Sequence, residues 1–401
     1  MEFRDSPQEA AFRQEIRDFI RRELPRELTG RKSDWGLWAG GEAFFARGHD
    51  AVVAWRHKLG TKGWVAPAWP KEYGGAGLSV MEQFIFNEEM ALGRAPLVGG
   101  IGVGWAGPTI ILFGAEEQKR EHLEPILKGE TVWCQGFSEP EAGSDLASLK
   151  TQAVRDGDDY LITGQKTWAS GAHAADWMIL LARTDPDAPK HKGISFFLLD
   201  MTSPGISVRP LVNMLDSHEF NEVFFDNVRV PRKNLLGEEN KGWYVAGATL
   251  AFERSGVAHA VRHQLIVEQL LDYAREERPS GQSILERDPQ LRLELADRYL
   301  ETRVLRMMSY MVVSIQSRGQ VPNIEASIAK LYVSELDQRI AATGMRLLGL
   351  YGQLNRDPKW APLNGRVCRM YMHATASTIG GGTSEIQRNI IAIRGLGLPR
   401  A

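Results

Sequence analysis

Two changes of sequence pattern, near residues 130 and 240, constrain the fold of this 401-residue chain more than any other feature. Between them, short runs of β-forming residues are separated by Gly, Pro, Asp and Asn, as in strands joined by turns. The runs are Tyr160–Ile162, Trp177–Leu181, Ile194–Leu199, Ile206–Val208 and Val223–Phe225. On either side, apolar residues follow helical spacing. The sequence therefore predicts an α+β multi-domain fold with a helical N-terminal domain over 1–130, a middle β-barrel domain over 131–240 and a helical C-terminal domain over 241–401.

Proline and glycine interrupt the helical regions. The segment Trp64–Pro70 cannot lie inside a helix, because its prolines lack the amide donor that a helix interior requires. In the C-terminal region the expected breaks are near Pro279–Gly281, Pro322 and Asp357–Pro362. They leave room for four helices, which predicts a four-helix bundle.

Composition excludes several classes of protein. The formal net charge is −2, with 48 basic and 50 acidic residues, so nothing indicates a nucleic-acid surface. Cys134 and Cys368 lie far apart and lack metal-ligand or disulfide spacing, which favours a reducing, cytoplasmic setting and no metal site. The apolar stretch Val98–Phe113 is short and rich in glycine, and charges interrupt the first apolar residues. Neither a membrane span nor an export signal is therefore expected.

The run Gly380-Gly381-Gly382-Thr383-Ser384-Glu385-Ile386-Gln387-Arg388 is the most informative motif near the C-terminus. Consecutive glycines allow close approach to a ligand and unusual backbone torsions. Ser384 and Gln387 have the spacing of a capping box, so a helix is predicted to begin at Ser384. A helix start favours bound anions. The run is thus either a cofactor cradle or an ordinary helix cap after a turn.

Two upstream segments favour the cradle. Gly136–Leu146 reads Gly-Phe-Ser-Glu-Pro-Glu-Ala-Gly-Ser-Asp-Leu, and Gly164–Ser170 reads Gly-Gln-Lys-Thr-Trp-Ala-Ser. Together with the C-terminal run and the Trp-Pro-x-x-Tyr-Gly-Gly loop at 69–75, they resemble the flavin-binding motifs of the acyl-CoA dehydrogenase family, in the same order. The resemblance implies the α, β, α architecture already predicted and FAD as the cofactor.

The resemblance also implies a catalytic base. Most members carry a glutamate immediately before the Gly-Thr-Ser segment, but this chain has Gly381 there. A minority, including isovaleryl-CoA and long-chain acyl-CoA dehydrogenases, place the glutamate on a central helix before an arginine, and this chain has Glu253-Arg254 at that place. On residues alone a Glu-Arg pair is usually a solvated or structural pair. With the loss at 381, however, Glu253 becomes the expected base, and Arg254 and Gly381 are expected near the substrate.

The remaining contacts follow the same resemblance. Trp168 is expected to pack on the flavin ring, although a tryptophan in this region can also be core filler. The other expected cofactor contacts are Ser138, Gly143, Ser170, Arg278, Thr383 and Glu385, with Ser144 on the CoA side. His173 is close enough in sequence to tune the site, whereas His218 and His373 are expected to be surface or packing residues.

The expected reaction is dehydrogenation of an acyl-CoA to a trans-2-enoyl-CoA, with electrons passed to an electron-transferring flavoprotein. Two alternatives remain: an oxygen-using acyl-CoA oxidase or flavin monooxygenase, and a subunit of a heteromeric dehydrogenase. The expected assembly is a homodimer, a homotetramer or a heterotetramer with a homologous subunit. The small residues at 380–382 favour a branched or ring-bearing acyl group.

Overall fold

The structure is a computed structural model that describes residues 5–29, 50–249, 256–277, 281–322, 324–355, 357 and 359–399. These residues form two compact units. Unit 1 contains the described parts of Met1–Trp38, Ser79–Pro96 and Arg254–Ala401, and unit 2 contains those of Ala39–Leu78 and Leu97–Glu253. Because five stretches of chain alternate between the units, the chain passes from one unit to the other four times.

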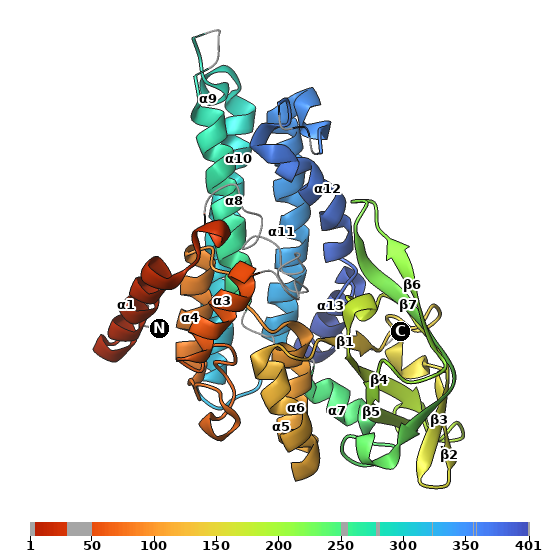
Figure 1. Cartoon of the computed structure of the whole chain (residues 1–401). Helices are drawn as coiled ribbons and strands as arrows, with labels where there is room; N and C mark the ends of the chain where they lie inside the picture. The colour runs from red at the N-terminus through yellow and green to blue at the C-terminus, as the bar shows by residue number, and fades with distance from the viewer. Residues whose placement is uncertain are drawn as a thin grey trace. The chain divides into compact units, whose positions relative to one another are not determined.

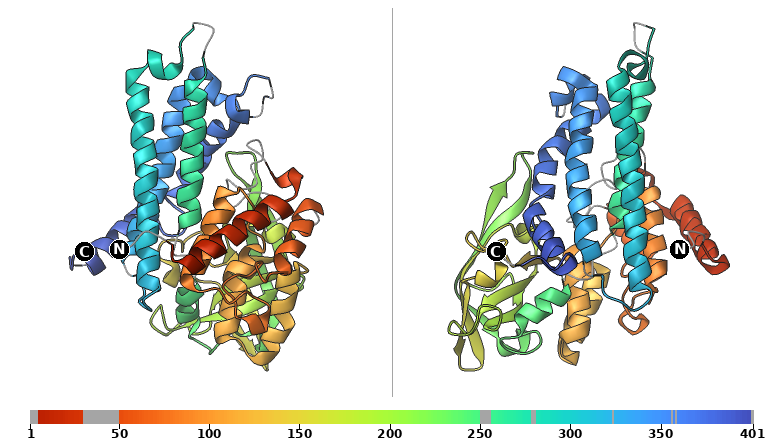
Figure 2. Two further views of the ribbon diagram at one scale, coloured as in Figure 1. Left: turned by 90° about the vertical axis from the view of Figure 1, so that its left-hand side faces the viewer. Right: turned by 180° about the vertical axis from the view of Figure 1, so that it is seen from behind.

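Unit 1 is helical. Its helices are α1 (Pro7–Glu23), α4 (Val80–Leu92), α8 (Val257–Arg275), α9 (Ile284–Arg287), α10 (Pro289–Gln316), α11 (Ile324–Leu348), α12 (Arg366–Ser377) and α13 (Ser384–Ile390). The long helices α8, α10 and α11 lie side by side, and α12 runs along α11 (Figures 1 and 2). Buried aliphatic side chains such as Val267, Leu305 and Ile340 form the core between them. The predicted break at Pro322 separates α10 from α11, as expected.

Local signals in the sequence fix several helix starts. Ser6 and Glu9 form a capping box before α1, and Ser79 and Glu82 form another before α4. At the start of α10, the Asp288 side chain accepts a hydrogen bond from the helix, and a proline occupies the first position. These signals satisfy amide groups that a helix leaves free at its N-terminus.

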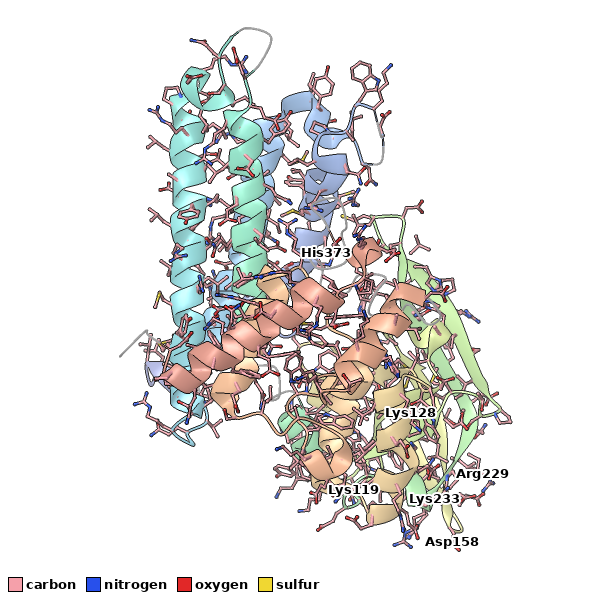
Figure 3. The ribbon with its side chains drawn as sticks, turned by 60° about the vertical axis from the view of Figure 1, so that its left-hand side comes forward. Lys119, Lys128, Asp158, Arg229, Lys233 and His373 are labelled. Carbon is pink, nitrogen blue, oxygen red and sulfur yellow. The ribbon has the colours of Figure 1, made fainter. Side chains whose placement is uncertain are left out.

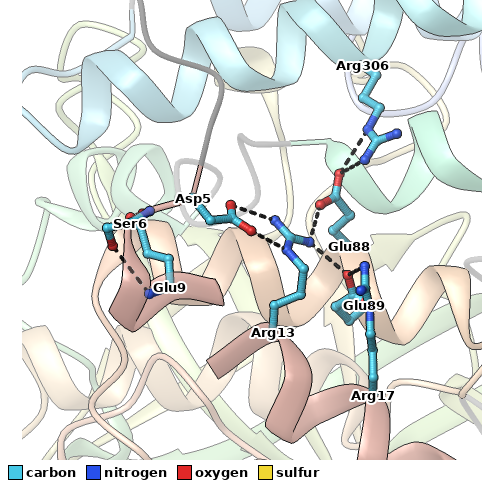
Figure 4. A network of polar contacts seen from close by, with 8 residues as sticks. All are labelled: Asp5, Ser6, Glu9, Arg13, Arg17, Glu88, Glu89 and Arg306. Carbon is cyan, nitrogen blue, oxygen red and sulfur yellow. Dashed lines mark hydrogen bonds and ion pairs between the residues drawn. The ribbon is translucent and has the colours of Figure 1, made fainter. Parts of the chain in front are cut away.

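Buried charges join three helices of unit 1. Glu88 and Glu89 on α4 are almost fully buried (0% and 2% exposed). The Arg13 guanidinium of α1 donates to both carboxylates, at 2.6 and 2.8 Å, and Arg17 donates twice to Glu89 (Figure 4). Arg306 of α10 donates to Glu88 at 2.9 Å. Every buried carboxylate of this network therefore faces at least one arginine, as burial of charge requires.

Unit 2 contains a curled sheet with helices. The helices are α3 (Asp50–Gly60), α5 (Gly107–Phe113), α6 (Glu116–Lys128) and α7 (Gly242–Thr249), and the strands are β1 (Trp133–Gly136), β2 (Gln152–Asp156), β3 (Asp159–Lys166), β4 (Trp177–Arg183), β5 (Ile194–Asp200), β6 (Ile206–Val212) and β7 (His218–Pro231). The strand order is β1-β4-β2-β3-β7-β6, and β5 also pairs with β4. The predicted fold class is confirmed: a curled sheet in the middle of the sequence, with helical regions before and after it.

Strands β4 and β5 are buried on both faces. Ile179 of β4 and Phe196 of β5 belong to the cluster that also contains residues of α5, α6 and α7. Their neighbours Met178 and Phe197 belong to a second cluster inside the curl of the sheet. Burial on both sides explains why these strands read as continuous apolar runs rather than as alternating ones.

The surface of unit 2 carries paired charges. Lys119 and Lys128 of α6, both labelled in Figure 3, contact Glu116 and Glu124 one turn earlier, at 2.8 and 2.7 Å. Exposed pairs of this kind contribute little to stability. Among the described residues, no helix is both long and apolar enough to cross a bilayer.

Candidate active site

Unit 2 brings two of the predicted motifs together where β1 and β3 end. The Thr167 amide donates to the Ser138 carbonyl at 2.9 Å. One residue further on, Glu139 and Ala142 exchange two backbone hydrogen bonds of 3.1 Å and close a tight turn. The predicted contact Ser138 therefore lies against the segment that carries Trp168 and Ser170.

A buried ion pair fastens the two motifs to each other. The Lys166 ammonium, which is fully buried, donates to the Glu139 carboxylate at 2.8 Å and to the Phe137 carbonyl at 3.0 Å. The amides of Lys150 and Thr151 donate to the same carboxylate at 2.6 and 2.9 Å. Both members of the pair stand inside the quoted motifs, but sequence analysis assigned them no role, because their pairing appears only once the strands are placed.

Burial and attraction act against each other in this pair. Burial lowers the pKa of Lys166 to about 8, although the charge of Glu139 opposes that shift. Burial alone would raise the pKa of Glu139, but the Lys166 charge and the hydrogen bonds that the carboxylate accepts bring it below its usual value. The carboxylate is thus stabilised as an anion, whereas the ammonium lies close to its titration point.

Trp168 has the features of a ligand platform. Its side chain is 61% exposed, and its backbone has φ +58°, a conformation that is strained for a bulky residue. The indole meets Phe220 edge to face, with ring centroids 5.8 Å apart. Strained torsions persist where the surroundings impose them, typically at functional sites. An exposed ring held in this way suits a flat aromatic ligand, and the alternative of core filler is excluded by its exposure.

The turn after the Ser-Glu-Pro sequence leaves space for a ligand. Gly143 and Ser144 are both exposed, and a Cβ added to Gly143 would meet no atom within 4 Å. Neighbouring residues hold the turn in place: Lys190 bonds Asp145 at 2.8 Å, and Arg183 donates to the Ala147 carbonyl at 2.7 Å. Internal packing therefore does not explain the glycine at 143.

Gln135 is a candidate site residue that sequence analysis missed. It lies on β1, three residues before Ser138, and its buried side-chain nitrogen has no hydrogen-bond partner in the described structure. A buried donor without an acceptor costs free energy, so it marks a place where a ligand oxygen can bind. No sequence signal distinguishes Gln135 from an ordinary strand residue.

The glycine-rich run lies in unit 1. Gly381 and Gly382 have φ +67° and +90°, which favours glycine at both positions. The predicted helix start at Ser384 is confirmed, but the predicted capping residue is wrong by one position. Thr383, not Ser384, caps α13, and its hydroxyl accepts from the Ile386 amide at 3.2 Å. The capping box is also wrong, because the Gln387 side chain turns back and donates to the Gly381 and Gly382 carbonyls.

Lys330 of α11 donates hydrogen bonds to this turn, a contact that the sequence did not predict. Its ammonium donates to the Gly382 carbonyl at 2.6 Å and to the Ser377 carbonyl at 3.3 Å, and burial lowers its pKa. Beside the turn, the Ser384 hydroxyl is buried, and none of the residues described here bonds it. Glu385 is exposed, and hydrogen bonds from its own amide and from Thr383 lower its pKa.

Three predicted site residues cannot be placed. Glu253, Arg254 and Arg278 lie outside the described residues. The structure thus groups Ser138, Trp168 and Ser170, with Gly143 and Ser144 on the next turn of unit 2, and separately groups Gly381, Thr383 and Glu385 in unit 1. His373 of α12 (Figure 3) is partly buried, and burial lowers its pKa.

Comparison with protein families decides the identity of this site. Residues 6–130 match the N-terminal domain of acyl-CoA dehydrogenases, residues 134–228 the middle domain and residues 240–396 the C-terminal domain. The chain belongs to the acyl-CoA dehydrogenase family. This dehydrogenase is 36% identical over 392 residues to the acyl-CoA dehydrogenase IpdE1 of Mycobacterium tuberculosis, covering 97% of each chain. It is 36% identical to FadE26 of the same organism, over 99% of this chain and 98% of that one.

Solved structures agree with this assignment. The Tcur3481-Tcur3483 steroid ACAD matches with a TM-score of 0.86 and 32% identity, covering 100% of both chains. The ChsE4-ChsE5 complex from Mycobacterium tuberculosis matches with a TM-score of 0.82 and 34% identity, also over 100% of both chains. The family resemblance inferred from the sequence is therefore confirmed.

FAD is the cofactor of this dehydrogenase, and the residues present fit it. A flavin needs an aromatic surface for its ring and hydrogen-bonding groups along its polar edges. The exposed indole of Trp168 provides the first. In the same unit, the buried Gln135 side-chain nitrogen, which has no partner among the described residues, is a hydrogen-bonding group.

Proposed function

We propose that this dehydrogenase converts an acyl-CoA to a trans-2-enoyl-CoA with Glu253 as the base. The observation that carries the proposal is the absence of a carboxylate at 381. Gly381 is exposed, and an added Cβ would have Lys330 Cε, at 3.9 Å, as its only described neighbour within 4 Å. The nearby Glu385 is a poor base, since its hydrogen bonds lower its pKa. Glu253 stands in an apolar stretch of sequence, where a carboxylate gains basicity by losing water.

The predicted site residues then have separate proposed roles. Glu253 takes the proton from the carbon next to the thioester. Bound FAD would supply the acceptor for the hydride of the following carbon. Trp168 supports the flavin ring, and Ser138 and Ser170 bond its polar edge. Gly143, Arg278, Thr383 and Glu385 complete the cofactor site, while Ser144, Arg254 and Gly381 face the substrate.

Replacement of one carboxylate tests the base. Glu253→Gln should bind FAD and acyl-CoA as before. The rate at which acyl-CoA reduces the flavin should fall by about 10³-fold or more, because no other group takes the proton. Glu268→Gln on α8, which removes a partly exposed carboxylate that accepts from Gln264, is the matched control. Rapid flavin reduction in Glu253→Gln would remove this residue from the mechanism.

We propose a bulky acyl group, such as a steroid side chain, as the substrate. The glycine run leaves space beside Gly381, and one similar structure is titled a steroid ACAD. A panel of straight, branched and ring-bearing acyl-CoA thioesters, followed by dye reduction, tests this. Turnover restricted to short straight chains would contradict the proposal.

An electron-transferring flavoprotein is the proposed acceptor. The competing candidate is oxygen, because the prolyl acyl carrier protein oxidase AnaB shares this fold with a TM-score of 0.79 and 28% identity. Reduced enzyme mixed with air-saturated buffer separates the two: fast hydrogen peroxide release indicates an oxidase, and slow release indicates a dehydrogenase.

A homo-oligomer, or a heterotetramer with a homologous subunit, is the proposed assembly, since the similar structures Tcur3481-Tcur3483 and ChsE4-ChsE5 are each named as a pair of proteins. Native mass spectrometry of the chain, expressed alone and with a neighbouring homologue, distinguishes these. A cytoplasmic location remains a prediction, which cell fractionation checks.

A further inference from the structure

A small hydrogen-bonded cluster lies beneath the segment that carries Trp168. Asn221 of β7 is fully buried, and its side chain contacts His173 of the short helix η5 (Ala172–Ala174) and His218 at the start of β7. The two imidazole rings stack with centroids 4.1 Å apart. Sequence analysis treated His218 as a surface or packing residue, but the structure brings it directly against His173.

The hydrogen bonds of this cluster have a fixed direction. The Asn221 Nδ2 atom donates to the Ala169 carbonyl at 3.0 Å, and a carbonyl can only accept. The remaining Nδ2 proton therefore points to His173 Nδ1 at 3.2 Å, which must accept. The Asn221 Oδ1 atom then accepts from His218 Nε2 at 2.8 Å. The arrangement requires an unprotonated Nδ1 on His173 and a proton on Nε2 of His218.

Asn221 also holds the same segment through its backbone. Its carbonyl accepts from the Ala169 amide at 3.0 Å, and the Glu219 carbonyl accepts from the Gly171 amide at 2.9 Å. The buried residue Ala169 is thus bonded at both its amide and its carbonyl by Asn221. These bonds begin immediately after Trp168, whose left-handed backbone needs such support.

We propose that Asn221 is a positioning residue for the flavin-facing segment Trp168–Ser170, and that His173 and His218 fix the orientation of its amide. This inference rests on the proposed contact of Trp168 and Ser170 with FAD. It assigns no contact with FAD to the cluster itself. Asn221 acts through the Ala169 backbone.

Solvent protons can reach the two histidines. Both rings are exposed, and they line a cavity of about 320 Å³ together with Asn221, Met201 and Pro210. The other ionisable residues on or next to these elements are Asp176, Asp200, Arg209, Asp216, Glu219, Glu222, Asp226 and Arg229. Several of these have partners: Gln165 bonds Glu222, the Val132 amide bonds Asp176, and Arg209 lies over the Phe224 ring.

Acid should loosen the cluster. Burial and the charge of His218 lower the pKa of His173, which favours the neutral acceptor that Asn221 needs. The neutral ring contributes fully above the ordinary histidine pKa of 6.5, and its contribution is lost as the pH falls through the lowered value. Protonation at Nδ1 then places two donors face to face.

Hydrogen–deuterium exchange of the apoprotein tests the positioning role without FAD or substrate. Asn221→Asp keeps the shape but removes both donated bonds, so exchange at Ala169 and Gly171 should accelerate by about tenfold. Asn227→Asp, on the exposed part of the same strand, is the control and should leave the exchange rates at Ala169 and Gly171 unchanged. If Asn221→Asp does not fold, His173→Phe preserves ring stacking and removes only the acceptor.

FAD affinity provides the second measurement. Asn221→Asp and His173→Phe should each raise the Kd for FAD by about tenfold. His173→Gln offers an acceptor oxygen in place of Nδ1, so its Kd should stay close to that of the wild type. Lowering the pH from about 7.5 to about 5.5 should weaken FAD binding in the wild type and less in His173→Gln. Faster exchange with an unchanged Kd, or unchanged exchange in both variants, overturns the proposal. An unchanged Kd in Trp168→Ala would instead show that the proposed flavin contact is wrong.

Discussion

Both units bury carboxylates, but they neutralise them with different cations. In unit 1, arginines surround Glu88 and Glu89 (Figure 4). In unit 2, a single lysine, Lys166, faces Glu139. An arginine offers a planar fork that stays charged at any pH a protein survives, whereas a lysine is a compact charge that can lose its proton when buried.

This difference in cation predicts a different dependence of the two buried ion pairs on pH. The unit 1 network fastens helices and keeps its charge across the neutral range. The unit 2 pair fastens the two flavin motifs, and its lysine has a pKa of about 8. The ion pair that joins the two motifs of the proposed flavin site is therefore the one whose cation has a pKa close to neutral pH.

The largest expected effect comes from breaking the arginine network. Glu88→Gln should lower the free energy of unfolding of unit 1 by about 3–5 kcal/mol, because the partly buried, charged Arg306 and Arg13 both lose this carboxylate. Urea unfolding followed by hydrogen exchange in α1 and α10 measures this loss. Glu27→Gln, an exposed change in the short helix Arg26–Leu28, is the control and should change little.

Glu139→Gln should cost less, about 1–3 kcal/mol at pH 7, because Lys166 can respond by losing its proton. The variant should also bind FAD more weakly, since the two motifs are no longer fastened together. Urea unfolding and FAD titration at the same pH give both numbers.

The pH dependence separates the two pairs further. The folded pKa of Lys166 lies below its ordinary 10.5, so the folded state binds fewer protons from about 8 to 10.5, and the contribution of Lys166 to stability rises with pH over that window. The wild type thus loses the attraction of the pair above pH 8, and the cost of Glu139→Gln should shrink from pH 7 to pH 9. The cost of Glu88→Gln should stay constant over that range. Equal pH dependence in both variants would refute the comparison.

The smallest effect is expected at the edge of the arginine network. The Arg17 side chain is 46% exposed, and its partner Glu89 keeps Arg13 when Arg17 is removed. Arg17→Ala should therefore cost about 0.5–1 kcal/mol, and salt should reduce the cost further. A loss as large as that of Glu88→Gln would mean that exposure does not weaken this pair.

The fold was largely predictable from sequence pattern, and the exceptions have physical causes. All five predicted runs lie in strands, but β1 and β2 were missed. Strand β1 is four residues long and ends in glycine, and β2 buries only Ala153, so neither shows an apolar run. The cap of α13 was misplaced because Thr383 and Ser384 both carry hydroxyls, and the choice between them depends on the turn before them.

The site was predictable only where a motif is continuous in sequence. Ser138 and Trp168 lie in such motifs, and the structure places them side by side through Thr167. Lys330 reaches the Gly382 carbonyl from another helix, 52 positions earlier in the chain. The unpartnered donor of Gln135 becomes visible only when burial is known. Contacts of this kind depend on tertiary packing rather than on local pattern.

The alternation of chain segments between the units sets an order of events during protein synthesis. Phe84 of α4 packs against Tyr310, with ring centroids 4.6 Å apart, and against Val313 and Val257, all of which leave the ribosome much later. A nascent chain that has just released β7 already contains every strand of the sheet, while α4 still lacks its covering helices. Translation therefore leaves the apolar face of α4 uncovered until the C-terminal helices that pack on it have been made.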